Sequence, residues 1–226
     1  MFKKIVNNII GILLLPLTVS AVASFFIILF YLPELTDGAY YFIGGMALCT
    51  ITRKILPKAA VLYILGHELT HALWCKLFGG KVYRINVSAE GGSMQGSVSN
   101  VWVKLAPYFF PIYTVIIGLF FGALALFFDM LPYYNAFIFL LGFSLQFHYL
   151  YTGDSLKIKQ SDIHKAGVII SAAIIPLINV AVIVLLLQLV IPEMSVLKLW
   201  YAQTYRLVVV LYGLIAGYIL RAAAYK

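Results

Sequence analysis

The chain has 226 residues, of which 63% are hydrophobic and only 11% are charged, and its mean hydropathy is +1.00. Soluble domains are about half apolar and about a quarter charged, so this composition excludes a water-soluble fold and predicts an integral membrane protein. The net charge of +8 lies on lysines and arginines scattered over short loops. That pattern is typical of topology signals in a multi-pass membrane protein and excludes a nucleic-acid-binding face.

Seven apolar segments predict an all-α membrane protein with six to seven transmembrane helices, folded as a single domain over residues 1–226. The second segment is shorter than a full span and contains Gly44 and Gly45, so it is expected to be tilted, re-entrant or peripheral. The connectors are short, and the orientation of the N-terminus stays open. We expect the helices at residues 8–32, 38–52, 57–78, 101–128, 133–152, 164–191 and 196–222.

The connector after the third helix differs from the others. Gly79 and Gly80 end the helical pattern, and residues 81–87 then alternate between apolar and polar side chains. A turn at Gly91-Gly92 and a second alternating run at residues 93–99 complete the pattern of a β-hairpin. An open strand edge cannot face lipid, so the hairpin is expected at the membrane interface or along a cavity within the protein.

The third helix carries three titratable residues within one turn: His67, Glu68 and His71. Side chains four residues apart share one helix face, so both imidazoles could bind one metal ion. A Zn²⁺ ion at this place would acidify water and polarise a carbonyl, and Glu68 would accept the water's proton as the general base. The simpler interpretation is a set of hydrogen bonds between helices, but polar groups are costly in a membrane helix unless they are paired or functional.

These residues resemble the site-2 protease family of intramembrane zinc metalloproteases. The resemblance rests on GHELTHALWCKLFGG, the hairpin and the Leu105-Ala106-Pro107 opening of the next helix, and it covers roughly residues 60–170. It implies a zinc metalloendopeptidase with a catalytic core at about residues 57–170, in the plasma membrane of a bacterium. It also implies substrates that are membrane-spanning or membrane-anchored peptides, received by the hairpin (Val82 to Ser99) as an added strand.

The third zinc ligand departs from the family pattern, because neither Leu-Asp-Gly nor Asn-Pro-x-Asp-Gly occurs in this chain. Asp162 ranks first, because a compact bacterial branch of the family pairs a His on one helix with a Gln-x-Asp at the start of the next. Asp162 would otherwise be an ordinary N-cap. His148 ranks second, as a ligand, a transition-state stabiliser or an interhelical hydrogen-bonding group, and Asp154 ranks third. Glu90 is a more remote alternative, at a spacing known from soluble thermolysin-like enzymes.

Two other functions remain open from the sequence. A zinc transporter or sensor could use the same ligands, although a transporter would be expected to place polar residues along a whole path. A catalytically inactive scaffold could keep the protease-like fold. The substrate, any adaptor or regulator, and the oligomeric state cannot be read from the residues.

Overall fold

A computed structural model describes residues 2–31, 36–55, 59–158 and 160–224. The described chain is mostly helical and has a two-stranded antiparallel hairpin directly after the third helix, as predicted. Leu32 and residues 57–58, at the ends of two predicted helices, lie outside the described residues. The chain divides into two compact units, Met1–Glu34 with Gly167–Lys226, and Leu35–Ala166. The single domain over residues 1–226 stays a prediction.

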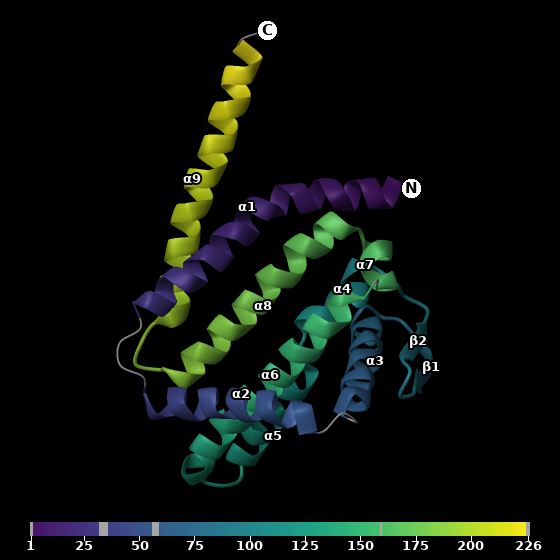
Figure 1. Cartoon of the computed structure of the whole chain (residues 1–226), viewed down its shortest axis with the longest axis vertical. Helices are drawn as coiled ribbons and strands as arrows, with labels where there is room; N and C mark the ends of the chain where they lie inside the picture. The colour runs from purple at the N-terminus through teal and green to yellow at the C-terminus, as the bar shows by residue number, and fades with distance from the viewer. Residues whose placement is uncertain (1, 32–35, 56–58, 159, 225–226) are drawn as a thin grey trace. The chain divides into compact units, whose positions relative to one another are not determined.

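The described part of the first unit contains three helices, each long and apolar enough to cross a membrane: α1 (Phe2–Phe30), α8 (Val168–Val190) and α9 (Val196–Ala224). α1 packs against both of the others (Figure 1). At Gly11 the backbone of α1 approaches that of α8 so closely that a Cβ atom would lie 2.6 Å from the nitrogen of Ile170. The indole of Trp200 in α9 donates a hydrogen bond to the carbonyl of Ala21 at 2.9 Å.

The second unit holds the predicted chemistry. Its long helices α2 (Asp37–Ile55) and α6 (Tyr134–Lys157) cross at two glycines, Gly45 and Gly142, where a Cβ atom would overlap the backbone carbonyl of the facing helix. This close crossing explains why the second apolar segment has glycine there, since any larger side chain would keep the two helices apart. The unit contains α2 (Asp37–Ile55), α3 (Ala59–Leu77), β1 (Val82–Val87), β2 (Gly92–Gly96), α4 (Val101–Phe109), α5 (Ile112–Ala125), a 3₁₀ turn at Leu131–Tyr133, α6 (Tyr134–Lys157) and α7 (Ser161–Ala166).

Two of the predicted helices are interrupted. The helix expected over residues 101–128 bends by 75° between α4 and α5, because Pro111 has no N–H with which to continue the helical hydrogen bonds. The helix expected over residues 164–191 breaks at Gly167, whose φ of +120° is a conformation that only glycine adopts readily. With α4 and α5 counted as one span, up to four described helices are long and apolar enough to cross a membrane, and α2 is not among them.

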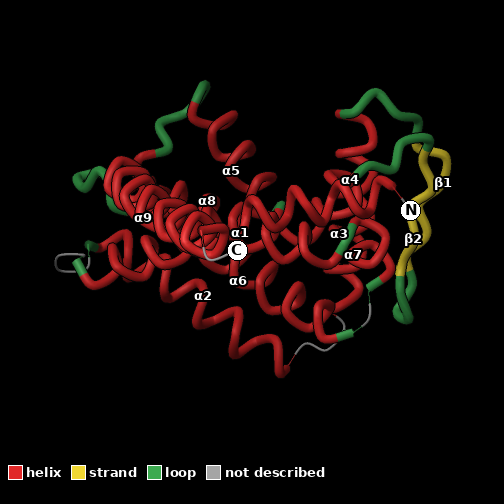
Figure 2. The backbone as a smooth tube through the Cα atoms, turned by 90° about the horizontal axis from the view of Figure 1, so that it is seen from above, coloured by secondary structure: helices red, strands yellow, loops and turns green. Residues whose placement is uncertain are grey.

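The hairpin lies beside α3. β1 pairs with β2 in antiparallel register, with Ile85 opposite Met94 and Val87 opposite Gly92. Both strands contact α3, and Figure 2 shows them in yellow at the edge of this unit. The loop closes through a hydrogen bond from the N–H of Ser88 to the carbonyl of Gly91 at 2.9 Å. The hairpin thus places β2 next to the turn of α3 that carries His67, Glu68 and His71.

Candidate metal centre

The two histidines of α3 lie on one face of the helix, as their spacing predicts. Their ring centroids are 4.9 Å apart, and the ring planes are inclined by 78°. Glu68 and His71 are buried, with 6% and 7% of their surfaces exposed. Tyr108 places its ring edge-on against His67 at 5.3 Å between centroids. The aromatic contact restricts the rotation of His67 and so helps to fix the direction in which its nitrogens point.

Asp162, in the first turn of α7, joins the two histidines. One potential ligand atom from each of His67, His71 and Asp162 lies within 4.8 Å of the other two, which is a spacing that can hold a metal ion. Nε2 of His71 is 3.4 Å from Oδ2 of Asp162. Burial would raise the pKa of the Asp162 carboxyl, but the hydrogen bond and positive charge of His71 outweigh it and lower that pKa below its usual value. The carboxyl is therefore ionised at neutral pH, which is the form that binds a cation.

The backbone of α4 orients His71. Nδ1 of His71 lies 2.7 Å from the carbonyl oxygen of Val103, and because a carbonyl only accepts, Nδ1 carries the proton. With a metal ion bound, Nε2 would carry no proton and would be free to act as the ligand atom. Val103 is held in place by the first turn of α4, where Asn100 Oδ1 caps the helix by accepting from the N–H of Val103 at 2.9 Å.

A cavity of about 430 Å³ opens beside these residues. Glu68, His71 and Asp162 line one part of it, and β2 lines another. Gly92 lies directly against Glu68, since a Cβ atom there would be 2.7 Å from Cγ of Glu68. The other lining residues are Tyr83, Ser93, Met94, Gln95, Gly96, Val98, Ser99, Val103, Lys104, Ser161 and Lys165.

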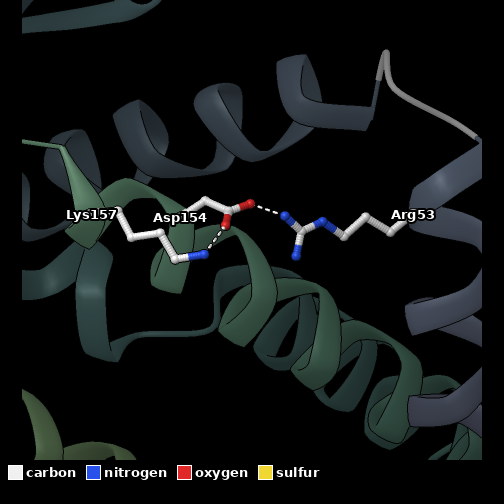
Figure 3. Close-up of polar contacts among 3 residues, drawn as sticks. All are labelled: Arg53, Asp154 and Lys157. Carbon is white, nitrogen blue, oxygen red and sulfur yellow. Dashed lines mark hydrogen bonds and ion pairs between the residues drawn. The ribbon is translucent and has the colours of Figure 1, made fainter.

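Two of the other candidate ligands lie elsewhere. Asp154, on α6, forms ion pairs with Arg53 of α2 and with Lys157, the latter at 3.0 Å (Figure 3). These contacts join the ends of α2 and α6, and they use both carboxylate oxygens. Glu90 is exposed in the loop of the hairpin, where its N–H donates to Ser88 Oγ at 3.3 Å. Neither residue belongs to the metal-spaced group found among the described residues.

His148 occupies a different place. It is a buried residue of α6, 6% exposed, and its ring hydrogen-bonds to the backbone of Tyr108. It interacts electrostatically with His67, but it lies outside the group of three ligand atoms that the described residues form. Asp162, and not His148, therefore belongs to the described group whose spacing could hold a metal ion.

The Val103 carbonyl and Gly92 both shape the site, but no pattern in the sequence identified their roles. The Val103 carbonyl is a backbone group in an apolar stretch, and no side-chain pattern marks it. Gly92 reads as a turn residue next to Gly91, but it lies in β2, and its missing side chain leaves room for Glu68.

No protein-family model, no curated protein and no solved structure matches this chain. The resemblance of residues 60–170 to site-2 proteases stays a prediction.

Proposed function

We propose that the protein is an intramembrane zinc metalloprotease, with His67, His71 and Asp162 as zinc ligands and Glu68 as general base. The observation that carries the proposal is the convergence of Asp162, about ninety residues distant in sequence, on the His pair of α3. Two ligands that each lie about 2.0–2.1 Å from a tetrahedral ion are about 3.3 Å apart. The distance of 3.4 Å between His71 Nε2 and Asp162 Oδ2 fits that geometry.

The donor set also fits zinc in kind. Two imidazoles and one carboxylate are ligands typical of catalytic zinc, which keeps a further position open for water or substrate. When bound, zinc would acidify water and polarise the scissile carbonyl. Glu68 lines the cavity next to His71 and Asp162, so its carboxylate is placed to take a proton from the attacking water and pass it to the leaving amine. Its burial among these residues restricts access of bulk water to the reacting groups.

The membrane setting defines the substrate class in this proposal. With α4 and α5 counted as one span, four described helices qualify as spans by length and composition alone. The proposal adds α3 and α6, which gives six crossings, or seven if α2 also crosses. α3 carries three of the polar residues of the site, and α6 carries buried polar residues such as His148, which lowers the hydropathy of both helices. Such residues are tolerated in a membrane when they face other helices. The substrate would be a membrane-spanning or membrane-anchored peptide, in the plasma membrane of a bacterium, with or without an adaptor.

The hairpin supports a peptide substrate. β2 lines the cavity from Gly92 to Gly96, and Val98 and Ser99 continue this wall. A peptide that added to the hairpin as a further strand along β2 would pass Glu68, because Gly92 touches that side chain. Main-chain hydrogen bonds of this kind give affinity with little dependence on sequence.

The direct test compares wild type with Glu68→Gln in proteoliposomes that contain a fluorogenic membrane-spanning peptide. We expect wild type to contain stoichiometric zinc and to cleave the peptide, and Glu68→Gln to keep zinc and lose cleavage. Glu90→Gln is the matched control, because Glu90 is exposed in the hairpin loop, and it should behave as wild type. Wild-type cleavage by Glu68→Gln would refute the mechanism. A zinc-free but correctly folded wild type, or zinc flux across the vesicles without cleavage, would refute the proposed function.

A further inference from the structure

His67 and His71 differ in the hydrogen bonds made by their Nδ1 atoms. Nδ1 of His71 bonds to the Val103 carbonyl, whereas Nδ1 of His67 is fully buried and has no hydrogen-bond partner among the described residues. A metal-binding histidine almost always donates its second ring N–H to a carboxylate, a carbonyl or water, and this bond fixes the tautomer and orientation of the ring. His67 therefore needs an acceptor near its Nδ1, if Nε2 faces the metal as it does in His71.

His148 has a buried ring nitrogen that lacks a hydrogen-bond donor among the described residues. Nε2 of His148 is also fully buried and has no partner within the described part of the chain. Its other nitrogen, Nδ1, makes the bond to the Tyr108 backbone, so in the neutral ring Nδ1 carries the proton and Nε2 is an acceptor. His148 thus offers a lone pair in the same buried region in which His67 has an unpaired donor.

A small cavity lies beside both histidines, and its volume is close to that of one water molecule. Both histidines line a cavity of about 10 Å³, separate from the large cavity beside Glu68. A volume of roughly 10–15 Å³ is the lower limit for one buried water, which also needs at least two polar partners. The two unpaired ring nitrogens supply these partners.

We propose that His148 is the positioning residue of His67, and that it acts through one water molecule held between His67 Nδ1 and His148 Nε2. The Tyr108 carbonyl sets the tautomer of His148, His148 orients the water, and the water accepts the proton of His67 Nδ1. His67 then presents Nε2 as a lone pair to the metal, as His71 does through Val103. This inference rests on the proposed zinc site, and it gives His148 a role that is not that of a ligand.

The test measures zinc affinity of the purified full chain by competition with a chelator. His148→Phe is expected to weaken zinc binding by ~10- to 100-fold, the usual effect of losing such a supporting contact, while metal-free stability is kept. His148→Asn provides an acceptor oxygen and should recover part of the affinity. Ser144→Ala is the matched control, because Ser144 is buried one turn away on α6 and bonds to Thr114 Oγ1 at 3.0 Å, not to His67. It should bind zinc as wild type does.

A second readout separates a positioning residue from a ligand. Cobalt in place of zinc has a visible absorption whose intensity depends on the number of ligands, and His148→Phe should leave that intensity unchanged. A changed cobalt spectrum would make His148 a ligand and overturn the inference, and so would unchanged zinc affinity in His148→Phe. Either result leaves the protease proposal intact if wild type still binds zinc and Glu68→Gln is inactive. Failure of wild type to bind zinc would instead remove the proposed function itself.

Discussion

The contact between Gly92 and Glu68 makes a sharp prediction about catalysis. In Gly92→Ala, the new Cβ atom would lie 2.7 Å from Cγ and 2.8 Å from Oε1 of Glu68, and 2.8 Å from Cγ2 of Ile64. Ordinary contacts of a Cβ atom begin at 3.4 Å, so Glu68 or β2 must move by the difference between 3.4 and 2.7 Å, about 0.7 Å. A misplacement of about 1 Å in a catalytic group can lower the rate by about 100-fold. We therefore expect kcat to fall by ~10- to 100-fold.

The assay is cleavage of a fluorogenic membrane-spanning peptide in proteoliposomes, together with the zinc content of the same samples. Zinc should stay at the wild-type level in Gly92→Ala, because none of the three proposed ligands is among the atoms nearest to the new methyl group. Gly118→Ala is the control, since a Cβ atom at that position in α5 meets nothing within 4 Å. Unchanged kcat in Gly92→Ala would refute the reasoning, and loss of zinc together with activity would show that the hairpin supports the metal rather than the base.

Three further predictions concern the metal and the helix packing. Asp162→Asn should lose most of its zinc, whereas Asp154→Asn should keep it because that carboxylate pairs with cations; equal zinc contents would contradict the ligand assignment. Gly142→Ala should lower the unfolding temperature in detergent, since its methyl group would overlap the carbonyl of Phe42, and overpacking of this kind costs typically ~1–3 kcal/mol. An unchanged unfolding temperature would mean that α2 and α6 can move apart to make room for the methyl group with no loss of stability. Removal of zinc by a chelator should also lower the unfolding temperature, in wild type and in Glu68→Gln alike, because a ligand at about 1,000 times its Kd stabilises the fold by about 4 kcal/mol. A smaller shift in Glu68→Gln would show that Glu68 binds the metal.

The long elements of the fold could be predicted because apolar length is visible in a sequence. α3 and the hairpin appear where the glycines at 79 and 80 and the alternating pattern place them. The break between α4 and α5 was harder to predict, because Pro107 and Pro111 look alike in the sequence. Pro107 stays within α4, and only Pro111 interrupts the helical path. The choice between them depends on packing against other helices, which a sequence does not show.

The candidate site also has parts that the sequence could predict and parts that it could not. The helix period brings His67, Glu68 and His71 together, since that relation is local in the chain. Asp162 could only be ranked, because its approach to His71 depends on the packing of α7 against α4. The acceptor for His71 could not be predicted at all, because a backbone carbonyl has no residue type.

The bend between α4 and α5 divides one apolar segment into two regimes of mutational tolerance. α4 is buried from Val103 through Phe109 except at Lys104, whereas Thr114 is the one buried residue among the described positions of α5. Substitutions in α4 will be limited by volume, since its side chains fit against α3 and α7. If α5 faces lipid, as in the proposed intramembrane protease, substitutions in it will be limited by polarity, because lipid accepts any apolar shape but no unpaired polar group. Sequence variation within these 25 residues should therefore change character at Pro111.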